Sequence, residues 1–331
     1  MSKSERAQKA HNLPSFFYRF LNYPETGAII GAIILFAFFS FASKKFMTFS
    51  NLAGMLAISA EIGIIAIGMT YLIISGEFDL SVGSIFAVGA MCFTHLANAG
   101  LNTVVVFFVT LGLCAFLGFV NGIITIKTGI PSFLVTLGTM MLYRGVLLAI
   151  TRGYVVSYKA DVTLINVLGG KFVEPFYNTV IWFIILTLVF SIILTQTQYG
   201  NWIFATGGNK ETAKAMGINT DRVKLINFTL SGVLSGFSSC AHLSRLLFAN
   251  PTLGVGRELE AIAAATIGGA LLSGGYGSVI GTFIGSLIIG ASRNGLVLMG
   301  VPGHWYQGLV GLVLLITVAI NNTLRKRIMR V

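Results

Sequence analysis

The sequence consists mostly of long apolar runs separated by short polar segments. A helix needs about 20 apolar residues to cross the hydrocarbon core of a bilayer. The stretches that approach this length are 26–42, 52–74, 82–100, 103–126, 132–151, 178–195, 223–247, 258–274, 277–299 and 304–322. The runs predict an all-α integral membrane protein with about ten transmembrane helices. Counts of nine or eleven stay open, because the first run is short and 258–274 is rich in Ala and Gly.

Charge supports this class of protein. Charged residues make up 10% of the chain, whereas soluble domains carry about 25%. The net charge of +11 comes from Lys and Arg that lie mostly outside the apolar runs, which fits the positive-inside rule. Nucleic-acid binding is not expected, because no basic patch carries the aromatic side chains that stack bases.

Three basic clusters set the expected orientation. They are Lys3, Arg6, Lys9 and Arg19; Lys210, Lys214, Arg222 and Lys224; and Arg325, Lys326, Arg327 and Arg330. With ten spans, all three fall in the cytoplasm when the N-terminus does. The exceptions, on the opposite side, are Lys44, Lys45, Arg152, Lys159 and Lys171. Both termini are therefore expected to be cytoplasmic.

These patterns divide the chain into three parts. Residues 1–25 are a polar, basic cytoplasmic segment, and the run that follows lacks a small-residue cleavage site, so it is read as a retained span. Residues 26–322 form the transmembrane domain, interrupted by a cytoplasmic loop at 196–222. Residues 323–331 are a basic cytoplasmic tail.

The loop contains a short helix with a signal at each end. Asn209 is expected as the N-cap, and Glu211 in the first turn suits the positive end of the helix dipole. Gly217 is expected as the residue that ends the helix. A helix of about two turns is marginal alone in water. It must be held by its own bundle or by a soluble partner.

Few ionisable residues lie within the spans, and such residues usually face the bundle interior or a water-filled path. They are Glu61, Arg144, Arg245, Glu258, Glu260 and Arg293. Glu61 lies mid-span without a base four residues away, so it is either part of a transport path or a buried structural group. Arg245, Glu258 and Glu260 lie near span ends and are read as able to reach the interface. The four histidines are isolated in sequence, and the charges are too scattered for a proton relay.

Glycine spacing predicts close helix packing. Gly277, Gly281 and Gly285 recur every four residues, a pattern that lets helix backbones approach in lipid. Residues 75–84 weakly resemble residues 273–282, and transporter folds are often built from two related halves. Chance similarity between two glycine-rich turns is the alternative explanation.

Enzyme motifs are missing from the sequence. It has no HExxH, no GxSxG and no GxxxxGK[ST], so a P-loop of its own cannot hydrolyse ATP. The cysteines lie in apolar runs without CxxC spacing. No catalytic residue, metal site or cofactor is expected.

Two stretches of the chain read as motifs, one from Gly68-Met69-Thr70 to Ser75–Ser84 and one at residues 207–219. They are similar to GMT…SGGIDLSVGS and to GGNxxAAxxxGIN, and through them the chain resembles the membrane permease subunits of bacterial ABC sugar importers, the ribose permease group. A third match runs from Glu258 to Ser278, and the resemblance covers residues 30–322. Glu77-Phe78 replaces the usual Gly-Ile, and Glu260 stands where Asp is frequent.

The resemblance implies the partners and the role of the loop. The short helix would dock into a separate ABC ATPase through Asn209, Glu211, Ala213 and Gly217. Two permease chains, identical or paralogous, would enclose one path, and a periplasmic sugar-binding protein would deliver solute. The chain would then be a multi-pass protein in the lipid of the bacterial inner membrane, importing a monosaccharide such as a ribose-like pentose.

The path is expected to suit a neutral, polyhydroxylated solute, since fixed charges are few. Its candidate residues are Glu61, Asp79, Ser81, Ser84 and Asn294. A related permease for a polyol, a furanosyl signal molecule or a branched-chain amino acid is the first alternative. A stand-alone secondary transporter, which needs an ion gradient and no ATPase, is the second. A membrane enzyme is the third and has no catalytic constellation to support it.

Overall fold

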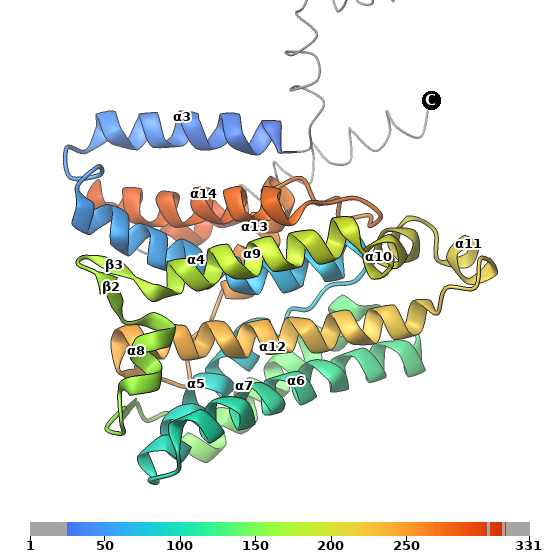
Figure 1. Ribbon diagram of the computed structural model, residues 1–331, viewed down its shortest axis with the longest axis horizontal. Coiled ribbons are helices and arrows are strands. Elements are labelled where there is room, and N and C mark those ends of the chain that lie inside the picture. Colours follow the sequence, from blue (N-terminus) through green and yellow to red (C-terminus); the bar gives the residue numbers. More distant parts are fainter. Residues whose placement is uncertain (1–24, 303–304, 313–314, 316–331) are drawn as a thin grey trace, which may run out of the picture.

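The computed structural model describes residues 25–302, 305–312 and 315. Within them the chain is a bundle of long helices with nearly parallel axes (Figure 1). The expected N-terminal segment before Glu25, the basic tail at 323–331 and most of the span at 304–322 lie outside the described residues.

Eight of the helices correspond to predicted spans, with boundaries that agree within three residues. They are α3 (Thr26–Ala42), α4 (Phe49–Ile74), α5 (Val82–Asn98), α6 (Thr103–Thr128), α7 (Ser132–Thr151), α9 (Asn178–Gln196), α12 (Thr220–Leu246) and α14 (Val279–Leu298). In the part of the chain that the structure describes, α4, α6, α7, α9 and α14 are both long and apolar enough to cross a membrane alone. The protein is thus an all-α membrane protein.

The predicted span at 258–274 is a shorter helix in the structure, α13 (Arg257–Ile267). Its 11 residues extend only about 16 Å, half of the about 30 Å hydrocarbon core. The helix ends before Gly269, which has a φ of +96°, a backbone conformation that favours glycine. This stretch therefore cannot cross a bilayer as one helix.

The two ends of the bundle differ in their connections. One end carries α10 (Gln198–Gly208) and α11 (Lys210–Ala215), and is called the α11 end (Figure 1). The opposite end, the α8 end, carries α8 (Thr163–Gly169) and the β2–β3 hairpin. Four short strands pair there, β1 (Val156–Ser157) with β4 (Phe248–Ala249) and β2 (Lys171–Val173) with β3 (Phe176–Tyr177).

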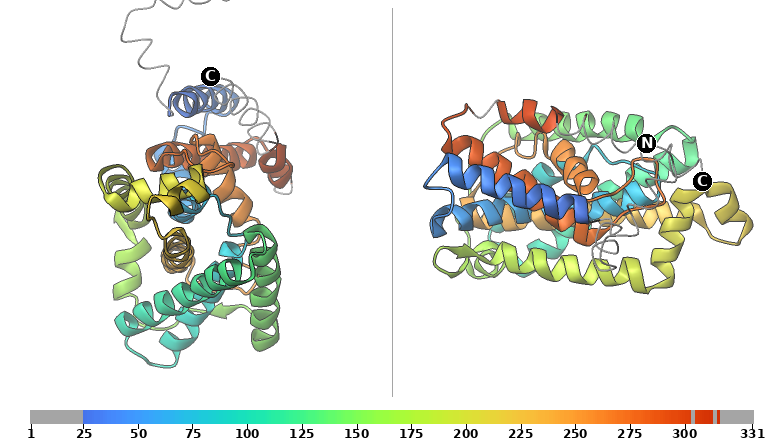
Figure 2. Two further views of the ribbon diagram at one scale, coloured as in Figure 1. Left: turned by 90° about the vertical axis from the view of Figure 1, so that its right-hand side faces the viewer. Right: turned by 90° about the horizontal axis from the view of Figure 1, so that it is seen from above.

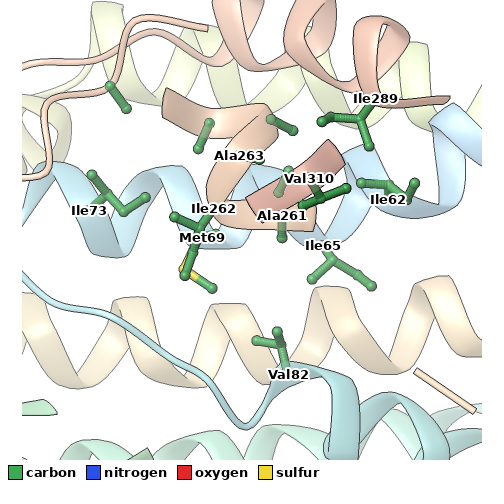
Figure 3. Close-up of a cluster of buried hydrophobic side chains, with 14 of the residues drawn as sticks. Ile62, Ile65, Met69, Ile73, Val82, Ala261, Ile262, Ala263, Ile289 and Val310 are labelled. Carbon is green, nitrogen blue, oxygen red and sulfur yellow. The ribbon is translucent and has the colours of Figure 1, made fainter. Parts of the chain in front are cut away.

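Helix α4 is the centre of the bundle, because most of its residues are buried, whereas α6, α7 and α9 expose most of theirs. Its side chains Ile62, Ile65 and Met69 pack with α13 and with Val82 at the start of α5 (Figure 3). The end-on view shows α12 between the layer that holds α4 and the layer that holds α6 and α7 (Figure 2). The apolar faces of α6, α7 and α9 are suited to lipid.

Two helix pairs approach so closely that only glycine fits. A Cβ on Gly285 of α14 would lie 2.0 Å from the Ala264 carbonyl oxygen of α13, and one on Gly281 would lie 1.9 Å from the Gly268 carbonyl oxygen. A Cβ on Gly277, before α14, would lie 2.7 Å from Cγ1 of the Ile74 side chain. Between α6 and α12, a Cβ on Gly118 would lie 2.3 Å from the Phe228 carbonyl oxygen.

The two similar glycine-containing turns lie side by side at the α11 end. The Gly275 backbone N–H donates to the Ile74 carbonyl at 2.8 Å. Nearby, the hydroxyls of Thr70 and Thr282 are 2.6 Å apart. Gly76 and Gly274 both have positive φ, +83° and +82°. These two turns therefore join α4 to the segment before α14.

Candidate functional site

A buried ionic cluster surrounds Glu61, midway along α4. Its Oε1 accepts hydrogen bonds from Arg245 of α12, at 3.0 Å from Nε and 2.9 Å from Nη2. Its Oε2 lies 2.7 Å from His242 Nδ1 and 2.8 Å from Arg257 Nη2. The Glu61 side chain is only 1% exposed, so all its charge is compensated within the protein. A carboxylate this buried is tolerated only with such partners.

Aromatic contacts hold the side chains of Arg257 and His242 in place. The Arg257 guanidinium lies over the Phe86 ring at 4.4 Å from its centroid, and the His242 ring meets Phe86 edge-on at 5.4 Å. Arg257 begins α13 after Gly256, whose φ of +85° lets the chain turn sharply into the helix. The cluster therefore joins α4, α5, α12 and α13.

Arg144 of α7 holds the loop between α12 and α13 in place. Its Nη1 donates to the carbonyls of Pro251 and Leu253, both at 2.6 Å, and its Nη2 donates to the Gly83 carbonyl at 3.0 Å. Arg144 is thus a structural clamp in this fold. It places the 252–256 loop against the start of α5.

A cavity of about 810 Å³ lies beside the ionic cluster. Among the described residues its polar walls come from Glu61, His242, Arg245, Thr252, Arg257, Glu258, Glu260, Arg293, Tyr306 and Gln307. His242 and Arg245 are in the last turns of α12, which begins beside α11 and runs about 40 Å for its 27 residues. The cavity therefore lies in the half of the bundle away from α11.

This arrangement corrects three interpretations of the sequence. Arg245 and Glu260 do not reach for an interface: Arg245 pairs with Glu61, and Glu260 is buried, with Oε1 3.6 Å from Arg293 Nη1. His242 is not isolated. Fixed charges are also not few here, because six charged side chains line the cavity, three acidic and three basic.

The other candidate path residues lie away from the cavity. Asp79 is buried, and its Oδ1 accepts from the backbone N–H and the hydroxyl of Ser81 at 2.9 and 2.6 Å. Asn121 of α6 donates to the Ser81 hydroxyl at 2.7 Å. Ser84 donates to the Met140 carbonyl, and Asn294 donates to the Asn51 side chain at 2.8 Å. Only Glu61 of the five candidates therefore lines the cavity.

Helix α11 carries the cap geometry expected from the sequence. The Asn209 side chain accepts from the Thr212 backbone N–H at 3.0 Å. At the other end Gly217, with a φ of +83°, donates to the Lys214 carbonyl, and Ile218 donates to the Ala213 carbonyl. This pair of bonds is a Schellman motif. Both ends of the short helix are therefore satisfied without a partner protein.

Helix α11 turns one side chain inward and the rest outward. Ala213 is buried, while Glu211, Lys214 and Met216 are exposed. Lys210 and Lys214 lie 3.7 and 4.0 Å from the carboxylate of Asp221 in α12. The bundle thus holds α11 through one small side chain and surface ion pairs, and leaves its outer face free.

Polar contacts near α11 connect α12 to the end of α4. Lys224 of α12 forms a buried ion pair with Glu77, and Asn227 donates to the Ser75 hydroxyl at 3.0 Å. In α10, a Cβ on Gly207 would lie 1.7 Å from the Ile74 carbonyl oxygen. The end of α4 is therefore in backbone contact with the helix that leads to α11.

No group of three His, Cys, Asp or Glu side chains suited to a metal ion occurs in the described ranges. The residues that the sequence missed are His242 as a cluster member, Arg257 and Tyr306. Arg257 lies just before an apolar run, and His242 and Tyr306 lie within two others. Their contacts with residues far along the chain left no trace in local patterns.

The chain matches a known family over most of its length. Residues 51–318 match the family described as the branched-chain amino acid transport system / permease component. The ribose import permease protein RbsC of Escherichia coli strain K12 is 35% identical over 303 residues, which cover 90% of this chain and 94% of that protein. RbsC of Bacillus subtilis strain 168 is 34% identical, covering 89% and 92%.

Other relatives carry different substrate names. The autoinducer 2 import system permease protein LsrC of Photorhabdus luminescens is 31% identical, over 92% of this chain and 91% of that protein. No solved structure matches the chain. The matches and the apolar helical bundle agree with the ordered motifs in the sequence. The chain belongs to the ABC importer permease family, in the group that contains the ribose permeases.

Proposed function

We propose that the chain is the transmembrane subunit of an ATP-driven, binding-protein-dependent importer that moves a monosaccharide across the bacterial inner membrane. The structural observation that carries this proposal is helix α11. It is capped at both ends, projects from one end of the bundle and keeps its outer face exposed. The family match supports the importer role, and relatives named for ribose import support a ribose-like pentose as solute.

In this proposal α11 is the coupling helix for a separate ABC ATPase. Glu211 offers a charge to the ATPase, while Asn209 and Gly217 fix the ends of the helix and Ala213 seats it on the bundle. Met216 is 78% exposed, so it offers an apolar contact that only a partner would cover. Movement of α11 would reach α4 through the backbone contact between Gly207 and Ile74.

The proposed orientation follows from this role. The α11 end and both chain termini face the cytoplasm, and the α8 end faces the periplasm. Lys210, Lys214 and Arg222 then lie on the cytoplasmic side, in agreement with the positive-inside rule. A second permease chain, either a copy or a paralogue, completes the path, and a periplasmic sugar-binding protein docks at the α8 end. The full span count, proposed as ten, includes the segment at 304–322, and it counts 258–274 as a span that α13 forms only in part.

The test is transport by the complex purified from its native membrane and reconstituted in proteoliposomes with ATP inside. Radiolabelled D-ribose, D-xylose, ribitol and L-leucine are offered with the co-purified binding protein. The proposal predicts ATP-dependent accumulation of a neutral sugar. Uptake that needs an ion gradient and no ATP would contradict it and indicate a secondary transporter.

A branched-chain amino acid is the second candidate solute, and one observation favours it. Both Arg257 and Glu260 line the cavity, and a zwitterion carries one charge of each sign. The family description also names such amino acids. ATP-dependent accumulation of L-leucine, without accumulation of any sugar, would establish this candidate instead.

A further inference from the structure

Buried polar atoms without a hydrogen-bond partner gather around one place in the described structure. Such atoms are rare in folded proteins, and each asks for an explanation. Among the described residues, five are Ser or Thr hydroxyls. The other four are His242 Nε2, Arg257 Nη1, Glu260 Oε2 and Tyr306 OH, and all four residues line the cavity beside Glu61.

These four atoms come from three segments of the chain. His242 belongs to α12, Arg257 and Glu260 to the first turns of α13, and Tyr306 to the helical segment after α14. All four residues are more than nine-tenths buried. Tyr306 and Glu260 interact electrostatically and through a side-chain hydrogen-bond contact, but this contact does not reach the geometry of a full hydrogen bond at the hydroxyl or at Oε2. Buried polar atoms without partners are costly to a fold, so four of them around one cavity point to a ligand.

The chemistry of the free atoms defines a complementary ligand. Arg257 Nη1 can only donate, and Glu260 Oε2 accepts. His242 Nδ1 lies 2.7 Å from the Glu61 carboxylate, which favours a proton on Nδ1; in the neutral imidazole Nε2 is then an acceptor. The Tyr306 hydroxyl does both. A ligand that donates and accepts at several adjacent points, as a sugar does through its hydroxyls, matches this set.

The charges of the cavity are already balanced within the protein. Arg257 uses Nη2 to pair with Glu61, and Glu260 lies opposite Arg293. The three acidic and three basic side chains that line the cavity cancel. A charged ligand would therefore add a charge without a counter-ion, whereas a neutral one uses only the remaining hydrogen-bonding capacity.

We propose that this cavity is the solute site of the permease, where His242, Arg257, Glu260 and Tyr306 bind the hydroxyls of one neutral monosaccharide. The inference rests on the proposed function as a sugar importer. The cavity volume of about 810 Å³ lies within the range of about 300–1,000 Å³ for small-molecule pockets. Its place in the half of the bundle away from α11 puts it on the side from which solute is delivered.

Glu61 acts in this site as a positioning residue. Both of its oxygens are occupied by Arg245, His242 and Arg257. It sets the orientation of the His242 ring and of one edge of the Arg257 guanidinium, and so leaves Nε2 and Nη1, in the wall of the cavity, without partners in the protein. The solute touches the side chains that Glu61 orients.

The test uses the complete reconstituted importer and compares sugars that differ by one hydroxyl. The probe is D-ribose with its monodeoxy analogues, or the corresponding set for whichever neutral sugar of the panel the wild type accumulates. Tyr306→Phe removes one hydroxyl and keeps the ring over which Arg293 lies at 5.4 Å. Tyr158→Phe is the matched control, because its hydroxyl is bonded to the Asp161 carbonyl outside the cavity.

We expect Tyr306→Phe to lower kcat/KM for the parent sugar about threefold to tenfold, the effect of one lost hydrogen bond. The wild type should already show this loss of kcat/KM with the one monodeoxy analogue that lacks the hydroxyl bound by Tyr306. For that analogue, Tyr306→Phe should lower kcat/KM by no more than about a further twofold. Tyr158→Phe should match the wild type for every sugar. The same binding protein is used throughout, so differences between variants arise in the permease.

Glu260→Gln provides a second test that changes no shape. This variant should lower kcat/KM for the parent sugar. It should also discriminate less than the wild type between the parent sugar and a second monodeoxy analogue, different from the one that Tyr306→Phe affects. If both variants match the wild type for all sugars, or reduce every sugar equally, the cavity is not the solute site, while the importer function stands. If the wild type accumulates no neutral sugar, the proposed function fails and the inference fails with it.

Discussion

Glu61 and Arg257 are 196 positions apart in the chain, and their side chains meet at 2.8 Å between Oε2 and Nη2. This contact joins the central helix α4 to the short helix α13. Since α13 and the segments around it form most of the cavity wall, the pair fixes the wall to the core of the bundle. The site that we propose for solute depends on this ionic cluster.

Removing the carboxylate of Glu61 should destabilise the protein strongly. In Glu61→Ala, Arg245 and Arg257 lose their counter-ion in a buried position, which costs about 3–5 kcal/mol. The melting temperature of the purified protein in detergent should fall by several degrees. Glu174→Ala is the control, because Glu174 is 75% exposed in its pair with Lys171, and it should melt like the wild type. Equal melting temperatures for both variants would contradict the account of the cluster.

The buried pair of Lys224 and Glu77 gives a prediction in two steps. Glu77→Leu leaves the ammonium of Lys224 buried and unpaired, so stability should fall by about 3 kcal/mol or more. Adding Lys224→Met should recover most of the loss, because two apolar side chains of similar volume can replace a buried pair. Thermal unfolding of the two single variants and the double variant measures the coupling. Additive losses would show that the pair is not energetically linked.

Close packing of α13 and α14 should be sensitive to one methyl group. Gly285→Ala would place its Cβ 2.0 Å from the Ala264 carbonyl oxygen, and overpacking of this kind costs about 1–3 kcal/mol. Gly138→Ala in α7 is the matched control, since nothing lies within 4 Å of its added Cβ. The yield of folded protein and its melting temperature should fall only for Gly285→Ala. A tolerated Gly285→Ala would mean that the helices can separate without loss.

Substitutions at Gly217, which ends α11, test the proposed coupling role by changing the backbone conformation there. Gly217 has open space around its Cβ position but a φ of +83°, so a substitution acts through strain of about 1–2 kcal/mol. Gly217→Val and Gly217→Trp should abolish sugar-stimulated ATP hydrolysis in the complex, while Gly217→Asn should retain more, because Asn tolerates this conformation. Membrane insertion, measured by the amount of protein in the membrane fraction, should be unchanged. Full stimulation in all three variants would remove the loop from the coupling pathway.

Glu211 tests the surface of the same helix. Its side chain is exposed and makes no ion pair among the described residues, so Glu211→Lys leaves the bundle intact. Transport should be abolished if this charge meets the ATPase. Asn219→Ser, a capping substitution in the same loop at the start of α12, is the control and should transport normally, since Ser caps helices about as well as Asn. Normal transport by Glu211→Lys would contradict the proposed contact.

The long helices could be predicted because their apolar runs are local signals. The caps of α11 at Asn209 and Gly217 were predictable for the same reason, since each cap is set by residues a few positions away. Helix α13 was overestimated because the Ala- and Gly-rich run 258–274 is apolar throughout. Hydropathy does not reveal that Gly269, just past the end of α13, takes a left-handed conformation that stops the helix.

The candidate site was only partly predictable. Glu61 was recognisable as a costly charge in mid-span, but its partners are 181 to 196 positions away. Asn294 and Ser84 are polar residues in apolar helices, as path residues would be, yet their hydrogen bonds serve the packing of neighbouring segments. A polar residue within a span is expected to be buried. Whether it lines a cavity or forms a hydrogen bond between neighbouring segments is shown only by its tertiary contacts.

The most direct test of the central proposal is purification of the tagged protein from its native membrane in a mild detergent, with identification of every co-purifying chain. We predict recovery of a P-loop ATPase together with a sugar-binding protein, and loss of the ATPase from the Glu211→Lys variant. A homo-oligomer without any ATPase, from membranes that transport the solute, would contradict the role of this chain as an ABC importer subunit.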